Sequence, residues 1–599
     1  MWKWLSRCVP GLSLLLLIAL LCLAFPDAMS RPPDILPWSR NHHPPPTTPH
    51  GNGPPRHPMP LSLTQKTFLG YTLLVHFNAF TFVCRLAQAF SRMLKETRAV
   101  LRRRPSSQSS SCTPSFCDSP MMTPSISTEH PICFDLGSLE DGKEGEVIHA
   151  IILPNYSDDL GTLQTTLRVL AYHPRAATQY EVFLAMEQKE ITAPEKAATL
   201  ISTFQERFRD ISGTFHPAGL AGEISGMGSN VAWAAKHIVE TRTEDTVDCR
   251  DVIITVKWMA TDTHLSQDYF NEIRHKHWQH NAEAERAFYA SPIIFDRNSN
   301  SVPILVRCAD LLWAFAGVSA MYPGCSIIIP TSVYSLPLAL AKRVGGWDGD
   351  PTAIGEDMHM LLKCYFETAG DIVTHVIASP ASQCNIQSTG DDNWGPGALT
   401  LFARYRQALR HMWGSLDTGY SVRQSVGCLV GKGSRRFQLK VRHLALFHLL
   451  FEAHFLPCHL TVLLVFSAVY TACVPASSMN PTLAWAFWIT GVLRGLVLRG
   501  LSFVGMNACI TLYDSWYDIC VGARARDMTK AGVNDTGFSF RKWYHPRQLA
   551  ERVCFPIAGT VFGSIPAIHA ELSHFWTDRL VYRVSKKPTF ASAPVALPV

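Results

Sequence analysis

The amino-acid sequence predicts an α/β domain with a mostly parallel sheet, flanked by transmembrane helices. In the middle of the chain, short runs rich in Val and Ile alternate with stretches of helical spacing. Long uncharged runs lie toward both ends, and basic residues gather directly beside them. Alternating strands and helices are typical of parallel sheets. Basic flanks mark the cytosolic ends of membrane spans.

The composition excludes several classes of protein. With 599 residues, of which 47% are hydrophobic and 17% charged, the chain is too apolar to be disordered. Its mean hydropathy of +0.06 is too low for a bundle of membrane helices alone. The net charge of +6 lies beside the apolar runs, which favours membrane topology over nucleic-acid binding. The 17 cysteines form no CxxC pair, so neither a disulfide framework nor a zinc site is expected.

The central α/β domain supplies the candidate site residues. Ligands of such sheets bind outside the carboxyl ends of the strands, so the polar residues that follow the strands are the candidates. We expect strands at residues 147–154, 181–186 and 251–256, with helices at 162–170 and 197–208.

Four groups of polar residues follow the predicted strands or precede the next apolar run. They occur in a fixed order along the chain, and the last group is directly followed by a basic segment. The groups are Asn155 to Asp159 with Glu187; Asp262 with His264; Glu356 with Asp357; and Gln407, Arg410 and Trp413.

In this order and between apolar runs, these motifs resemble those of membrane-integrated family-2 glycosyltransferases. This family has the GT-A-like fold of cellulose, chitin and hyaluronan synthases. The resemblance covers residues 148–420 and, loosely, the flanking spans. It implies an inverting, metal-dependent transfer of a sugar from a cytosolic nucleotide-sugar donor to a membrane-associated lipid or glycan acceptor.

The resemblance assigns four positions to the donor and its metal. Glu187 would contact the base or ribose of the nucleotide. Asp262 would hold the Mn²⁺ or Mg²⁺ that bridges the diphosphate, because the hard oxygen ligands of a carboxylate suit these ions. His264 is a second candidate ligand. Arg410 would clamp the diphosphate with its forked guanidinium.

The resemblance assigns the remaining positions to catalysis and the acceptor. Asp357 would be the general base that deprotonates the acceptor hydroxyl, with Glu356 beside it. The segment with Gln407, Arg410 and Trp413 corresponds to a QxxRW-type motif at the acceptor side. Trp413 would stack on a sugar ring.

Three departures from the family pattern leave a second hypothesis open. Ala260 stands where the first acid of a DxD motif is expected, and Met227 stands where related enzymes often carry a lysine. The QxxRW-type spacing is also looser, which argues against polymer synthesis. The alternative is a catalytically degenerate, glycosyltransferase-like membrane scaffold. A transporter built from the spans is a third hypothesis, for which the charge of Glu452 within an apolar stretch is the main argument.

Each candidate also has a purely structural interpretation. Glu187 fits a solvated loop at a strand end, and Asp262 fits a helix cap. Asp357 fits the cap of the helix that follows it, a role compatible with catalysis. Arg410 and Trp413 fit an anchor at the membrane surface.

Basic residues at 91–104 follow the second apolar run, so the domain is expected on the cytosolic side of the membrane. That membrane would be the Golgi, the endoplasmic reticulum or the plasma membrane. We expect four or five spans. Before the domain we expect a signal anchor or first transmembrane segment at 1–25, a Pro/His-rich loop at 26–67, a transmembrane helix at 68–90 and a basic and Ser/Pro-rich linker at 91–131. The catalytic domain covers 132–420 and is followed by a basic interfacial segment at 421–443. After it we expect transmembrane helices at 444–473 and 481–512, a cytosolic basic segment at 513–552, a transmembrane or re-entrant segment at 553–572 and a C-terminal tail at 573–599.

Overall fold

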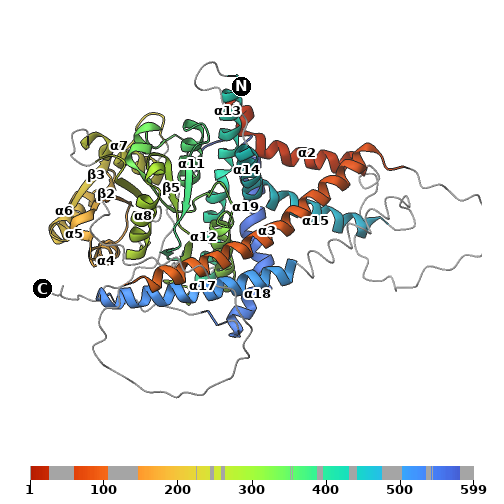
Figure 1. Cartoon of the computed structure of the whole chain (residues 1–599). Coiled ribbons are helices and arrows are strands. Elements are labelled where there is room, and N and C mark those ends of the chain that lie inside the picture. Colours follow the sequence, from red (N-terminus) through yellow and green to blue (C-terminus); the bar gives the residue numbers. More distant parts are fainter. Residues whose placement is uncertain are drawn as a thin grey trace, which may run out of the picture.

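The structure is a computed structural model in which a sheet domain is joined to long helices that lead away from it (Figure 1). Strands and short helices form the domain, while α2, α3 and α15 extend toward the right of the view. The structure describes residues 2–25, 60–104, 146–223, 226–242, 248–257, 263–350, 353, 355–387, 395–430, 441–474, 502–533, 541–542 and 544–580.

In this part of the chain, the central sheet has seven strands in the order β3-β2-β1-β4-β7-β5-β8. The four strands on one side are all parallel. β7 is antiparallel to both of its neighbours, and β8 is parallel to β5. The predicted mostly parallel α/β sheet is therefore present. The bounds are β1 (Ile148–Asn155), β2 (Tyr180–Glu187), β3 (Asp210–His216), β4 (Val252–Lys257), β5 (Ala287–Ala290), β7 (Val333–Pro337) and β8 (Val373–Val376).

The central strands are apolar because helices cover both faces of the sheet. Every residue of β1 is buried, and successive residues enter different cores. Ile152 packs in one core with α7 and α11, and Ile151 packs in the other with α4, α6 and α8. A strand buried on both faces needs a continuous apolar run. The helices are α4 (Leu160–Ala171), α5 (Ala176–Gln179), α6 (Ala193–Phe204) and α8 (Gln267–Gln279) on one face, and α7 (Met227–Thr241), α10 (Leu338–Arg343) and α11 (Glu356–Glu367) on the other.

A smaller layer of structure joins the sheet to the long helices. Two short parallel strands, β6 and β9, pair with each other, and α9 and α12 pack beside them. The bounds are β6 (Ile293–Phe295), β9 (Ala381–Gln383), the 3-10 turns η2 (Asn281–Arg286) and η4 (Trp413–Ser415), α9 (Ile304–Val318), α12 (Gly395–Met412) and α13 (Leu416–Val430).

By length and composition, three helices of the described chain are apolar enough to cross a membrane. They are residues 63–102, 441–470 and 546–573, and a shorter apolar helix covers residues 9–24. These helices coincide with four of the predicted apolar segments. The fifth prediction, 481–512, lies outside the described residues as far as 501. The elements are α1 (Trp2–Arg7), α2 (Val9–Ala24), α3 (Leu63–Arg102), α14 (Val441–Leu450), η5 (Phe451–Phe455), α15 (Leu456–Cys473), α17 (Ser502–Lys530), α18 (Pro546–Gly559), η8 (Thr560–Ser564) and α19 (Ile565–Ser573).

Helices α3 and α17 lie side by side and run in the same direction (Figure 1). Near the start of α17 and the middle of α3, Cys509 Sγ contacts the Val83 carbonyl at 3.5 Å. Further along, Trp516 Nε1 donates to Thr97 Oγ1 at 3.0 Å. Beyond the end of α3, Arg104 forms ion pairs with Asp527 of α17 and Asp268 of α8, at 2.8 and 2.7 Å. This guanidinium joins both long helices to the sheet domain.

The C-terminal helical segment α18–η8–α19 packs along the domain. Glu551 of α18 is completely buried between the guanidiniums of Arg307, on α9, and Arg541. Further along the segment, η8 and α19 contact α12. The segment is therefore fixed to the two helices of the domain that lie nearest the long apolar helices.

Candidate active site

The predicted acidic pair opens α11. Gly355 precedes the pair, and a Cβ atom at this position would lie 3.2 Å from Asp417 Oδ2 and 3.5 Å from the Gly414 Cα. The absence of a side chain therefore lets the start of α11 approach the α12–α13 junction closely. This approach places the acidic pair opposite the QxxRW-type segment.

Asp357 faces a small cavity and is held by two backbone N–H groups. Ser332 N–H donates to Oδ2 at 2.7 Å, and Met358 N–H donates to Oδ1 at 2.8 Å. The cavity has a volume of about 80 Å³, and its lining includes Asp357, Gln407 and Arg410. Burial raises the pKa of Asp357 to about 6, although both N–H groups favour the charged form. A carboxylate with this pKa is charged at neutral pH and suits proton abstraction.

Glu356 has different surroundings, although it is adjacent in the chain. Its side chain is buried against the sheet, where the Tyr334 hydroxyl donates to Oε1. Trp347 Nε1 in turn donates to the Tyr334 oxygen at 2.6 Å. Burial and the neighbouring Asp357 charge raise the pKa of Glu356 to about 8. At pH 7 Glu356 is therefore neutral while Asp357 is charged, and only Asp357 lines the cavity.

The opposite wall of the cavity comes from α12. Gln407 is buried and accepts a hydrogen bond from Arg404, whose guanidinium also pairs with Asp310 at 3.2 Å. One turn along the helix, His411 stacks on Trp313 with ring centroids 3.9 Å apart. These contacts fix the helix on which Arg410 reaches the cavity. The structure thus brings three predicted residues together, namely Asp357, Gln407 and Arg410.

Trp413 has a different position from the other residues of its motif. It is buried at the start of η4, where Nε1 donates to the Asp578 carbonyl at 3.2 Å. Its ring meets the His574 ring edge-on at 4.9 Å. Trp413 does not line the described cavity. Its predicted stacking on a sugar stays a prediction, and its contacts are those of a core residue.

His359 connects α11 to α13 behind the acidic pair. Its Nδ1 lies 2.6 Å from Asp417 Oδ1, and its Nε2 lies 3.2 Å from Asp348 Oδ2. Burial lowers the pKa of His359, but the two carboxylates outweigh this effect and raise it to about 9. The charged imidazole therefore forms a buried ion pair that holds the start of α11 against α13.

Several lining residues of this cavity were not predicted from the sequence, among them Ser332, Gln383, Trp313 and His411. They come from segments far apart in the chain, and the sequence gives no period or motif that joins them. His411 alone carried a signal, because it is adjacent to Arg410 within the QxxRW-type segment.

Glu187 lies where predicted, at the carboxyl end of β2. It is buried, with Oε2 at 3.3 Å from His216 Nδ1 and 3.7 Å from Lys189 Nζ. His216 ends the neighbouring strand β3, and its Nε2 lies 2.9 Å from Glu223. Met227 begins α7, which packs against the same strands. Glu187 is therefore part of a charged network at the carboxyl edge of the sheet rather than a solvated loop residue.

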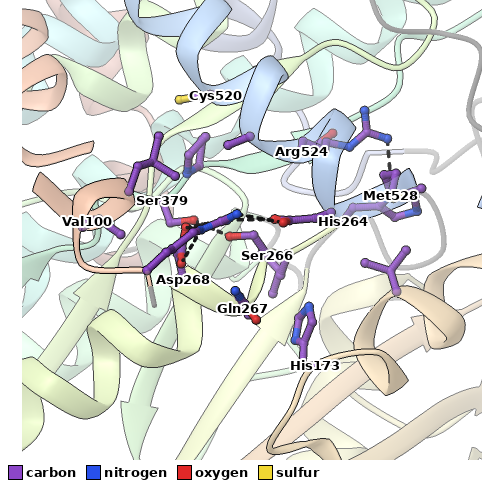
Figure 2. A pocket seen from close by; sticks show the side chains of 18 of the residues that line it. Val100, His173, His264, Ser266, Gln267, Asp268, Ser379, Cys520, Arg524 and Met528 are labelled. Carbon is purple, nitrogen blue, oxygen red and sulfur yellow. Dashed lines mark hydrogen bonds and ion pairs between the residues drawn. The ribbon is translucent and has the colours of Figure 1, made fainter. Parts of the chain in front are cut away.

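The predicted metal site is described only in part, because Asp262 lies outside the described residues. His264 lines a second cavity, of about 320 Å³, together with Asp268 of α8 and residues of α17 (Figure 2). The His264 backbone pairs with Ser382 at 2.8 and 3.0 Å, and its Nδ1 lies 3.3 Å from Arg524 Nη2. A guanidinium beside the ring disfavours a bound cation.

The role of His264 as a metal ligand stays a prediction, because the other predicted ligand is not described. Among the described ranges, no group of three His, Cys, Asp or Glu residues has the arrangement to hold a metal ion. The role of Asp262 stays a prediction.

A family model matches part of the chain, including much of the sheet domain. Residues 256–489 match the family model described as glycosyl transferase family group 2. The chain carries a family-2-like glycosyltransferase domain. The matched stretch begins in β4 and contains both walls of the cavity, with Asp357 on one and Arg410 on the other. The chain is an enzyme that transfers sugars, as its motifs predicted.

Two solved structures resemble this chain at low sequence identity. The first is the mannosyltransferase PcManGT from Pyrobaculum calidifontis in complex with GDP-Man and Mn²⁺, with 12% identity and a TM-score of 0.36 over 74% of this chain and 98% of that chain. The second is S. aureus TarS 1-349 in complex with UDP, with 12% identity and a TM-score of 0.29 over 63% of this chain and 92% of that chain. No curated protein matches the chain.

Proposed function

We propose that this enzyme transfers a sugar, with inversion, from a nucleotide-sugar donor to a membrane-associated acceptor, and that Asp357 is the general base. The observation that carries the proposal is the position of the Asp357 carboxylate, oriented by two N–H groups and opposite Arg410 across the cavity. The family match to a glycosyl transferase model supports the reaction class.

In this reaction, Asp357 accepts the proton of the acceptor hydroxyl as its oxygen attacks the anomeric carbon. The bond from that carbon to the nucleoside diphosphate breaks on the opposite face, so the configuration inverts. Arg410 stabilises the charge of the diphosphate through its guanidinium. Glu187, at the end of β2, contacts the nucleoside. Glu356 stays protonated and supports the position of α11 through Tyr334.

Mn²⁺ or Mg²⁺ remains the proposed cofactor, with Asp262 as its candidate ligand. When bound, such an ion would neutralise charge on the diphosphate. Asp262 is preferred to His264 as the ligand, because the Arg524 guanidinium lies 3.3 Å from His264 Nδ1.

We propose that α2, α3, α14–α15 and the segment leading into α17 are four membrane spans, with the catalytic domain in the cytosol. Packing of α2 against α3 and α15 supports its retention as a signal anchor. The buried pairing of Glu551 with Arg307 and Arg541 supports an interfacial position for α18–α19, on the surface of the domain. An interfacial position would make residues 553–572 a segment that does not cross the membrane.

An apolar groove supports a lipid rather than a glycan as the acceptor. The groove has a volume of about 400 Å³ and lies between α2 and α15, with Leu21, Val465 and Ile568 in its lining. Val462 and Ile568 of this lining also pack with Met412, at the end of the helix that carries Arg410. A hydrocarbon chain matches such a surface, whereas a glycan would leave its hydroxyl groups without partners.

Two measurements test the proposal. Asp357→Asn is expected to lower turnover by roughly 10²- to 10⁴-fold, the usual contribution of a general base, while donor binding stays intact. Calorimetric titration with UDP- and GDP-sugars plus Mn²⁺ identifies the donor. Retained turnover in Asp357→Asn would exclude this residue as the base.

The alternative function is a membrane scaffold that keeps the fold without a working donor site. Ala260 in the DxD-like segment and Met227 at the start of α7 favour it, because neither position supplies the charge that related enzymes use. Absence of binding at millimolar donor would support the scaffold and contradict the transferase.

A further inference from the structure

Ser332 has an unusual backbone conformation directly before β7. Its φ angle is 101°, in a region that residues other than glycine rarely adopt. Such conformations persist only where the surrounding structure holds them, and they cluster at functional sites. Here the conformation has a visible result, because it directs the Ser332 N–H to Asp357 Oδ2 at 2.7 Å.

A second residue holds Ser332 in place. Gln383 Nε2 donates a hydrogen bond to Ser332 Oγ, and both side chains are buried, with 1% and 4% of their surfaces exposed. Gln383 ends β9, where it is paired with Phe295 of β6. The hydroxyl of Ser332 is thus anchored to the small sheet, while its N–H reaches α11.

These contacts converge on one place. Ser332, Gln383 and Asp357 all line the cavity that Arg410 closes from the other side. Ser332 N–H binds one carboxylate oxygen and Met358 N–H binds the other, so the two donors together fix the plane of the carboxylate. Met358 is the next residue in the helix and follows Asp357 in any orientation. Ser332 is the donor that comes from outside the helix.

We infer that Ser332 is a positioning residue for Asp357, held in its strained conformation by Gln383. The inference rests on the proposed role of Asp357 as the base. Loss of the Ser332 N–H would let the carboxylate turn and would remove a donor that favours its charged form. The carboxylate would then be both misdirected and harder to ionise.

Two substitutions at Ser332 separate positioning from side-chain packing. Ser332→Gly keeps the N–H and accepts the positive φ, so it is expected to keep a wild-type pH profile. Ser332→Val has a branched side chain that disfavours this φ, so the N–H moves away from Asp357. For Ser332→Val we expect the acidic limb of the plot of kcat against pH to move up by about one pH unit. At pH 7 kcat should fall about tenfold, with little change in the donor KM.

Gln383 provides a test that does not depend on a difficult substitution at Ser332. Gln383→Met removes the donor to Ser332 Oγ at nearly constant volume, so it should shift the acidic limb in the same direction by a smaller amount. In a Ser332→Gly background there is no Oγ to bind, so Gln383→Met should have no further effect on the limb. This non-additivity is the signature of an action through Ser332.

A readout without turnover distinguishes this inference from the proposed function. A carbodiimide modifies carboxyl groups that hold a proton, so the extent of Asp357 modification against pH, followed by mass spectrometry of the full chain, reports its titration directly. The midpoint should lie near pH 6 in the wild type and higher in Ser332→Val.

The inference would be overturned if folded wild type and Ser332→Val had equal midpoints. It would also be overturned if Gln383→Met had an undiminished effect in the Ser332→Gly background. A shifted midpoint in an enzyme that transfers no sugar would support the positioning role and contradict only the proposed function.

Discussion

Glu356 and Asp357 are adjacent residues whose carboxyl groups have different protonation states at neutral pH. Glu356 faces the sheet and holds its proton, whereas Asp357 faces the cavity and is charged. The separation arises because the first helical turn directs successive side chains to different sides. Sequence alone marks the pair as a candidate, and the structure shows that only Asp357 lines the cavity.

Activity is expected to depend on the charged form of Asp357. Because the pKa of this residue is about 6, kcat should be constant above neutral pH and fall about tenfold per unit below pH 6. A pH profile of initial rates measures this limb. A limb near pH 4, the usual pKa of an aspartate, would show that the pKa of Asp357 is not raised or that its ionisation does not limit the rate.

Glu356→Gln is expected to preserve turnover, because the amide replaces a carboxyl that is already neutral. The substitution should also change the pH dependence of stability. The pKa of Glu356 rises from 4.5 when unfolded to about 8 when folded, so its contribution to stability is complete at acidic pH and is lost as the pH rises toward 8. Thermal unfolding at pH 5 and pH 8 should therefore differ less in Glu356→Gln than in the wild type. An equal difference in both proteins would contradict the assignment.

At the scale of the element, the sequence predicts β1, β2, β4 and the long apolar helices, because each has its own periodicity, but it does not predict β3 or β5 to β9. β1 and β4 are continuous apolar runs, and burial on both faces explains them. The antiparallel position of β7 between β4 and β5 depends on contacts between distant segments, which no local pattern contains. For the same reason the sequence finds Asp357 but not Ser332 or Gln383.

Trp413 illustrates a limit of motif spacing. An i, i+3 relation to Arg410 on one helix would place both side chains on the same face. In the structure α12 ends at Met412, and Trp413 begins a 3-10 turn that leads toward α13. The tryptophan side chain therefore enters the packing with α19, while Arg410 lines the cavity.

The attachment of α18 to the domain can be tested at Glu551. Its carboxylate is completely buried between two guanidiniums, so Glu551→Ala leaves Arg307 without its carboxylate partner, although Arg541 keeps Asp514, and is expected to cost about 3–5 kcal/mol. Glu240→Ala is the control, because its pair with Lys236 is exposed and worth less than about 1 kcal/mol. Unfolding of both variants in detergent measures the difference. Equal stabilities would show that α18 is held by other contacts.

The apolar groove can be tested with a matched pair on α15. Val465 lines the groove, whereas Val469, one turn later, does not, and their exposed fractions are 58% and 55%. Val465→Trp should fill the groove and reduce transfer of labelled sugar into the organic-solvent extract of membranes. Val469→Trp should leave this transfer unchanged. Equal transfer in the two variants would argue against the groove as a site for the acceptor chain.

At the scale of the whole molecule, the start of the N-terminal helices and the end of α3 both lie on the side of the sheet domain. Arg7 pairs with Asp578 at 3.2 Å, and Trp4 Nε1 donates to the Phe575 carbonyl at 3.1 Å. The basic end of α3 lies beside α8 of the domain. This arrangement agrees with the basic residues of the sequence marking one side of a membrane.

Two exposed positions give a test of this topology. Leu63 begins α3 on the far side, and Val441 begins α14 on the domain side, with exposed fractions of 80% and 82%. In a Cys84→Ser background, Leu63→Cys should react with a membrane-impermeant maleimide on sealed vesicles that expose the non-cytosolic face. Val441→Cys should react only after permeabilisation. The reverse labelling pattern would contradict a cytosolic domain.

Arg104 has a mechanical consequence for the whole enzyme. One guanidinium binds Asp268 and Asp527, so the ends of α3, α8 and α17 cannot separate without breaking a partly buried ion pair. α8 begins shortly after Asp262 in the chain. A force that tilts α3 relative to α17 would therefore reach the sheet domain at the start of α8, through this one guanidinium.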